Sequence, residues 1–136
     1  MKDRIRRFFE EHAGPEVVAV YLFGSHAEGR AHRESDVDLG VLLDRDRLPS
    51  EKERFETRLR LAGQLEGRLG TGRVDVVILD DAPPTLGREI VTRGELLVCR
   101  DATREHAFRR DVQLRAADLA PFLRRMRQIK LEALAR

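Results

Sequence analysis

The chain has 136 residues, 41% of them hydrophobic and 37% charged, which suits one domain with a single core and a well-hydrated surface. Its net charge of +2 does not by itself indicate a nucleic-acid-binding protein, and no apolar run resembles a membrane span or a signal peptide. Cys99 is the only cysteine, which excludes an internal disulfide and favours a cytoplasmic location. The positive excess lies at the C-terminal end, where residues 101–136 hold nine basic and five acidic residues.

The first third of the chain predicts one helix followed by two strands. Residues 2–13 have helical spacing of apolar side chains and end at a Gly-Pro pair. Residues 17–23 are a short continuous apolar run, typical of a buried strand, and residues 36–43 form a second one. Between them, the polar residues 24–35 contain two glycines and predict a tight turn followed by a short helix.

A long helix is predicted next, over residues 51–69. Ser50 followed by Glu53 is a capping-box pattern, which marks the beginning of a helix. The apolar positions expected to face the core are Phe55, Leu59, Ala62, Leu65 and Leu69. Two glycines then end the helix, and residues 74–79 predict a third strand.

The last third predicts a short helix over residues 85–92, a strand over 96–99 and helix thereafter, divided at Pro121. The alternation of helices and strands indicates an α/β (α+β) fold with a central mixed sheet of about four strands flanked by helices. No linker or repeat is evident, so we expect residues 1–136 to form a single domain whose C-terminal segment, about 103–136, is helical.

Three aspartates are the residues of this sequence that most clearly indicate a functional site. Asp36 and Asp38 begin the second strand, and side chains two residues apart in a strand lie on the same face. Two neighbouring carboxylates repel each other, so one of them is protonated, arginines pair with them, or a divalent cation binds between them. Asp75 lies within the third apolar strand, where a buried acid also needs a partner. Three carboxylates are a ligand set that Mg²⁺ prefers.

Gly24 and Ser25 follow the first strand directly and predict a phosphate-binding turn. Glycine permits close approach of the backbone to a ligand, and a serine at the start of a helix offers donors where the dipole favours anions. Phosphate beside metal predicts phosphoryl or nucleotidyl transfer, in which two Mg²⁺ ions roughly 3.5–4 Å apart hold the attacking and leaving oxygens. Asp36 and Asp38 would bind both ions, while Asp75 would bind one and accept the proton of the attacking hydroxyl.

The segment GSHAEGRAHRESDVD resembles the Gly-Ser-x10-Asp-x-Asp signature of the polymerase-β-type nucleotidyltransferase superfamily. The small size is similar to that of minimal nucleotidyltransferases, above all the antitoxins of HEPN/minimal-nucleotidyltransferase toxin–antitoxin pairs. Many members carry an arginine where this chain has Glu28, and Arg30 is a possible substitute.

The resemblance implies a Mg²⁺-dependent protein adenylyltransferase. Such an enzyme transfers AMP from ATP to a tyrosine of a HEPN ribonuclease toxin and so neutralises it. By motif position, Gly24 and Ser25 would bind the nucleotide, and Asp36, Asp38 and Asp75 would be the catalytic and metal-binding acids. A HEPN toxin is therefore the expected partner, with no role for a membrane and none for direct nucleic-acid binding. The alternatives are an antitoxin that acts by occlusion without catalysis, and a nucleotidyltransferase that modifies a small molecule.

The C-terminal tail allows two interpretations. It combines an apolar stripe with the basic residues Arg124, Arg125, Arg127 and Lys130. The favoured interpretation is a helix that packs on its own domain and presents a hydrated basic face. The other is a docking surface for the toxin or another partner.

Overall fold

The computed structural model describes residues 1–27, 29, 36–70 and 72–135. The elements in chain order are α1 (Lys2–His12), β1 (Val17–Phe23), β2 (Val37–Leu43), α2 (Glu51–Leu69), β3 (Val74–Ile78), the 3-10 helix η1 (Leu79–Asp81), α3 (Pro84–Arg93), β4 (Glu95–Cys99) and α4 (Ala102–Ala135). The predicted helices and strands in these ranges are confirmed to within two residues. The short helix predicted after the first turn falls mainly on 28 and 30–35, which lie outside the described residues, whereas residues 24–27 form turns.

The four strands form one mixed sheet in the order β3-β2-β1-β4. Strand β1 pairs antiparallel with both β2 and β4, while β2 and β3 run parallel. The central strand β1 is buried along almost its whole length, which explains its unbroken apolar sequence. Strand β3 is at an edge, so its side chains alternate between buried and half-buried positions.

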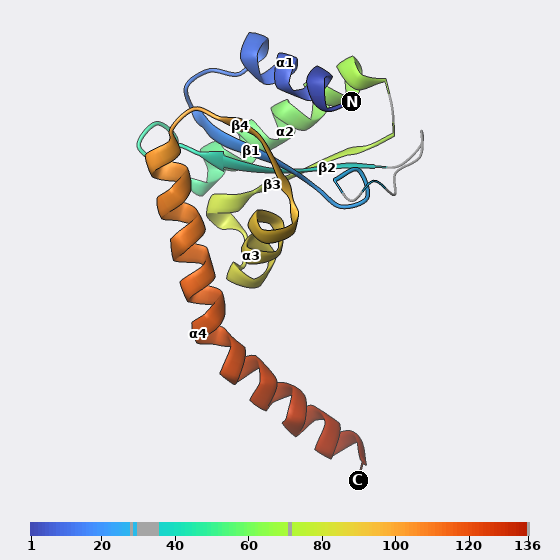
Figure 1. Cartoon of the computed structure of the whole chain (residues 1–136), viewed down its shortest axis with the longest axis vertical. Helices are drawn as coiled ribbons and strands as arrows, with labels where there is room; N and C mark the ends of the chain where they lie inside the picture. The colour runs from blue at the N-terminus through green and yellow to red at the C-terminus, as the bar shows by residue number, and fades with distance from the viewer. Residues whose placement is uncertain (28, 30–35, 71, 136) are drawn as a thin grey trace.

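Helices cover both faces of the sheet (Figure 1). Helices α1 and α2 pack on one face, where Ile5, Phe9 and Leu61 are fully buried against the strands. Helix α3 and the first part of α4 pack on the other face, where Ile90 and Val112 are buried. No helix among the described residues is long and apolar enough to cross a membrane.

Helix α2 has the predicted ends but a different buried face. Ser50 accepts a hydrogen bond from the backbone of Glu53, and the Glu53 side chain accepts one from the backbone of Ser50. The buried residues are Arg54, Thr57, Leu61, Leu65 and Leu69. The prediction that Phe55 and Leu59 face the core is wrong, because both side chains are about half exposed. Arg54 and Thr57 take the inward positions, since each has hydrogen-bond partners there.

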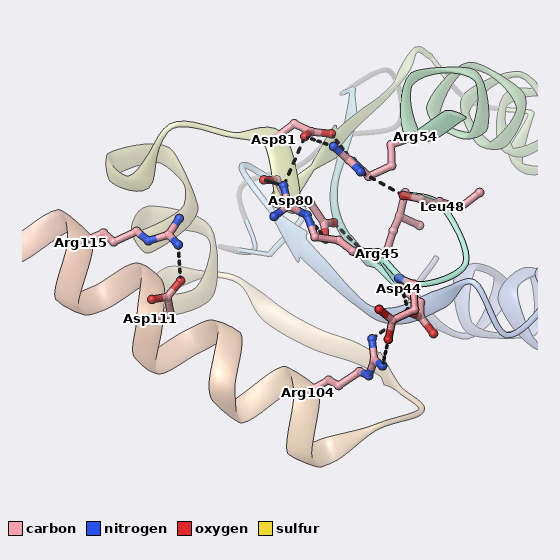
Figure 2. Close-up of polar contacts among 11 residues, drawn as sticks. Asp44, Arg45, Leu48, Arg54, Asp80, Asp81, Arg104, Asp111 and Arg115 are labelled. Carbon is pink, nitrogen blue, oxygen red and sulfur yellow. Dashed lines mark hydrogen bonds and ion pairs between the residues drawn. The ribbon is translucent and has the colours of Figure 1, made fainter. Parts of the chain in front are cut away.

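Ion pairs and hydrogen bonds join several elements at the C-terminal end of β2 (Figure 2). The buried guanidinium of Arg54 donates two 2.9 Å hydrogen bonds to the carboxylate of Asp81, which follows β3. A third bond of 2.9 Å joins Arg54 to the carbonyl oxygen of Leu48. On the other side, Arg104 of α4 binds Asp44 at 2.8 Å. These contacts connect α2, η1 and α4 to the β2 terminus.

Helix α4 differs from its prediction in two respects. It continues unbroken through Pro121, so the predicted division at that residue is wrong. Proline removes one backbone N–H, and at an exposed position water can satisfy the carbonyl that loses its partner. The favoured interpretation of the tail is also wrong: the helix leaves the body and its second half extends away from it (Figure 1). From Phe122 onward, every described residue is exposed.

Candidate active site

The turn after β1 and the start of β2 meet at close range. Phe23 pairs with Asp38 across the antiparallel strands, so Gly24 follows directly beside that carboxylate. Gly24 has φ +75°, and a β-carbon there would lie 2.4 Å from Oδ2 of Asp38. Both the backbone conformation and the missing side chain are therefore required, which explains why glycine precedes Ser25.

Asp38 is the electrostatic centre of this region. Partial burial, followed by the negative charges of Asp75 and Asp36, raises the pKa of Asp38 above its ordinary value. The nearby His26 acts in the opposite direction. Parallel pairing of β2 and β3 places Asp38 opposite Asp75 in register. The structure thus brings the three predicted acids into one field of negative charge.

Asp75 does not have the environment that the sequence predicted. Its side chain is 43% exposed instead of buried, because β3 is an edge strand. Its partner is Arg73, whose guanidinium donates a 3.1 Å hydrogen bond to Oδ1 of Asp75. This bond, together with the charges of Asp75 and Asp36, raises the pKa of Arg73. Sequence reasoning missed Arg73, although its position two residues before Asp75 and directly before β3 was the available signal.

The acids do not form a closed metal-ligand set. Among the residues that the structure describes, no three or more His, Cys, Asp or Glu side chains are grouped as metal ligands. The ion pair with Arg73 already engages Asp75. The chemistry of the donor set nevertheless fits a hard cation, because added positive charge would oppose the burial and the carboxylate repulsion that together raise the pKa of Asp38.

The predicted phosphate-binding turn is described in part. Gly24 to Ala27 form turns and are half-buried, with no helix over these four residues. The predicted helix that would direct its dipole at a phosphate falls on 28 and 30–35. Glu28 and Arg30 of the motif likewise lie outside the described residues.

Other candidate residues have structural roles. Tyr21 is buried and donates a hydrogen bond to Glu105 on α4, so it is a packing residue. Arg100 donates to the carbonyl oxygens of Phe9 and Gly14, which joins the end of β4 to α1. His106 is exposed and lies 3.5 Å from the Glu105 carboxylate. Arg100 and His106 therefore contact different partners.

Comparison with known families assigns the class of protein. The family model described as polymerase beta, nucleotidyltransferase matches residues 3–103, which is most of the chain and extends from α1 to the start of α4. The chain belongs to this family. It also has the sheet, the turn and the three aspartates that the resemblance led us to expect.

The chain is also similar in sequence or fold to individual characterised proteins. The chain is 37% identical over 83 residues to the protein adenylyltransferase MntA of Shewanella oneidensis. That match covers 61% of this chain and 55% of MntA, so it spans about half the length of the relative. A chain from the crystal structure of a toxin–antitoxin with AMP-PNP superposes with a TM-score of 0.69 at 25% identity, covering 99% of this chain and 98% of the other. A structure of a tri-AMPylated Shewanella oneidensis HEPN toxin with its MNT antitoxin gives a TM-score of 0.62 at 22% identity, covering 99% and 96%, and shows the shared fold.

Proposed function

We propose that the chain is a Mg²⁺-dependent protein adenylyltransferase that acts as an antitoxin. It transfers AMP from ATP to a tyrosine hydroxyl of a HEPN ribonuclease toxin and so neutralises the toxin. The observation that carries the proposal is the contact between Gly24 and Asp38, with Asp75 opposite Asp38 in the parallel pair. The kinship with MntA and the fold shared with toxin–antitoxin complexes support this acceptor.

In the proposed reaction the tyrosine oxygen attacks the α-phosphorus of ATP. The bond from that phosphorus to the bridging oxygen breaks, and pyrophosphate leaves. Gly24 and Ser25 bind the triphosphate through the turn, which follows β1 directly beside Asp38. Asp75 accepts the proton of the hydroxyl.

Asp36, Asp38 and Asp75 are the residues that would hold Mg²⁺. When bound, Mg²⁺ supplies positive charge that stabilises the pentacovalent phosphorus and the leaving pyrophosphate. Asp75 would have to exchange its ion pair with Arg73 for the cation. Arg73, once released from Asp75, would be a cation available to a phosphate oxygen. The need for ATP supports the cytoplasmic location predicted from the single cysteine. We also propose that residues 1–136 form one domain.

The test is AMP transfer to the partner. The protein is incubated with ATP labelled at the α-phosphate, Mg²⁺ and a HEPN toxin, the proposed acceptor, and label on the toxin and its added AMP mass are measured. We expect transfer by the wild type and none by the double variant Asp36→Asn/Asp38→Asn. Asp3→Asn is the matched control, because that aspartate is 90% exposed on α1. Equal transfer by the double variant and the wild type would refute the catalytic role.

A further inference from the structure

The second half of α4 presents an apolar stripe that nothing in the described part of the chain covers. The stripe consists of Leu119, Phe122, Met126, Ile129 and Ala133, with Leu123 and Leu134 beside it. The large side chains among these are between 37% and 75% exposed. Figure 1 shows this part of α4 extending well beyond the sheet and its other helices.

The exposed stripe continues a face that is already used for packing. In the first half of α4 the inward residues are Glu105, Val112 and Ala116, with Phe108 packed partly against the same core. At 3.6 residues per turn, Leu119, Met126 and Leu123 lie on this same side of the helix. The face that packs on the sheet and α3 therefore continues past the end of the body with its apolar character intact.

The spacing of the stripe indicates a helical occupant. From Leu119 to Ala133 the successive intervals are three, four, three and four residues, which is the a/d pattern of helix-on-helix packing. The tail also has little stability of its own. Pro121 interrupts the backbone hydrogen bonds, and a helix of about 14 residues is marginal in water without packing.

The charges of the tail indicate which kind of molecule packs on the stripe. Residues 117–135 contain four basic and two acidic side chains. Arg125 and Arg127 lie on the two borders of the stripe, and Lys130 lies within it. A parallel second copy would bring Arg125 of one helix beside Lys130 of the other, which is repulsive. Insertion into a membrane would bury Lys130 in the middle of the apolar face. An acidic partner helix satisfies all three cations.

We propose that residues 117–135 are a docking helix for a helical surface of the acceptor protein that has an apolar stripe bordered by Asp and Glu. This inference rests on the proposed function for the identity of the acceptor. The docking helix determines how tightly the acceptor is held, while Asp36, Asp38 and Asp75 determine whether AMP is transferred. Binding and transfer are therefore separable properties of one chain.

The test measures binding without chemistry. The full chain is titrated by calorimetry with the HEPN toxin used in the transfer assay, in the absence of ATP. We expect Phe122→Gln/Met126→Gln to raise the dissociation constant by about tenfold or more, because central apolar residues dominate helical interfaces. Leu131→Gln is the matched control: Leu131 is 56% exposed on the same segment but lies off the stripe, so its substitution leaves binding unchanged.

Two further readouts complete the test. Hydrogen exchange of amides 122–135 should be fast in the free protein and slow in the complex, and binding should weaken as salt is raised. Wild-type affinity in Phe122→Gln/Met126→Gln would overturn the proposal, as would equal loss in Leu131→Gln. So would a wild-type homodimer, or binding to anionic vesicles, that the double substitution abolishes. If the wild type binds through the stripe but transfers no AMP, the docking helix stands and the proposed function fails.

Discussion

Gly24 touches the carboxylate of Asp38 across the turn that joins the first two strands, with room for no side chain between them. Replacement by alanine would place a methyl group 2.4 Å from Oδ2 of Asp38 and would force a left-handed conformation on a residue with a side chain. We expect Gly24→Ala to lower AMP transfer by about 100-fold or more, since a displacement of about 1 Å at a reacting centre costs that much.

The control for this substitution is Gly70→Ala. Gly70 also has a positive φ, +62°, but a β-carbon there meets nothing within 4 Å. Both variants should lose about 1–2 kcal/mol of stability through the backbone, while only Gly24→Ala loses transfer. Thermal unfolding and the transfer assay, run together, separate the two effects. Equal activity in the two variants would show that the contact with Asp38 is unimportant.

Asp38 is predicted to reduce stability at neutral pH. Its pKa is raised in the folded protein, so the folded state holds the proton more tightly than the unfolded chain does. Ionisation of Asp38 therefore costs stability as the pH rises above its ordinary pKa of about 4. We expect Asp38→Asn to unfold a few degrees higher than the wild type at pH 7, with the difference disappearing below about pH 4.

Mg²⁺ should reverse this effect in the wild type. A bound cation would offset the negative charge of ionised Asp38. Added Mg²⁺ should therefore raise the unfolding temperature of the wild type and leave that of Asp38→Asn unchanged. Scanning calorimetry at pH 7 with and without Mg²⁺ makes both measurements. An Asp38→Asn protein that unfolds below the wild type at pH 7 would contradict the interpretation that burial and neighbouring carboxylates make the ionised form of Asp38 unfavourable.

Glu105 is predicted to anchor α4 to the sheet. It is completely buried and accepts hydrogen bonds from Tyr21 of β1 and from Arg109 one turn further along α4. Burial would raise the pKa of Glu105, but these two partners outweigh it and hold the pKa below its ordinary value. This stabilisation is present above the ordinary pKa of Glu and is lost as the pH falls through the lowered one.

We expect Glu105→Ala to cost about 2–3 kcal/mol, because it leaves the buried Tyr21 hydroxyl without an acceptor. Urea unfolding at pH 7 measures the loss. Glu89→Ala is the comparison: its 3.2 Å ion pair with Arg93 also joins residues four apart on a helix, but both side chains are more than half exposed. That substitution should change the free energy of unfolding by less than about 0.5 kcal/mol.

Arg54 is predicted to stabilise the end of β3. Its guanidinium is almost fully buried and binds both oxygens of Asp81. Arg54→Ala should cost about 2–3 kcal/mol, because it removes hydrogen bonds to a charged group and leaves that carboxylate unpaired. Arg58→Ala, one turn further along α2 at an exposed position, should have an effect within about 0.5 kcal/mol in the same unfolding experiment.

The elements that the sequence predicted correctly are those with a local physical cause. Strand β1 is a continuous apolar run, and it is buried on both faces by helices. Helix α2 begins and ends where predicted, because its capping box and Gly70 act within a few residues. The Gly24-Ser25 turn and the aspartates were identified by spacing, and strand pairing brings them together.

The features that were missed depend on partners distant in the chain. Nothing near Arg54 or Glu105 indicates that each is buried, because their partners Asp81 and Tyr21 come from other elements. Asp75 was expected to be buried because an edge strand and a central strand of this length look alike in sequence. The tail was expected to pack on its own domain because an apolar stripe is the same whether its cover is part of the chain or another molecule.

The strand order also has a consequence for the sequence of folding events. The proposed catalytic residues lie between Gly24 and Asp75, in or beside strands β1, β2 and β3, whereas β4 comes after η1 and α3 and pairs Cys99 with Ala19, much farther apart in the chain. Contacts of high sequence separation form late, and a nascent chain emerges from its N-terminus. The proposed nucleotide-binding residues should thus come together before β4 and α4 have packed, so the docking helix of this chain follows a site that is already assembled.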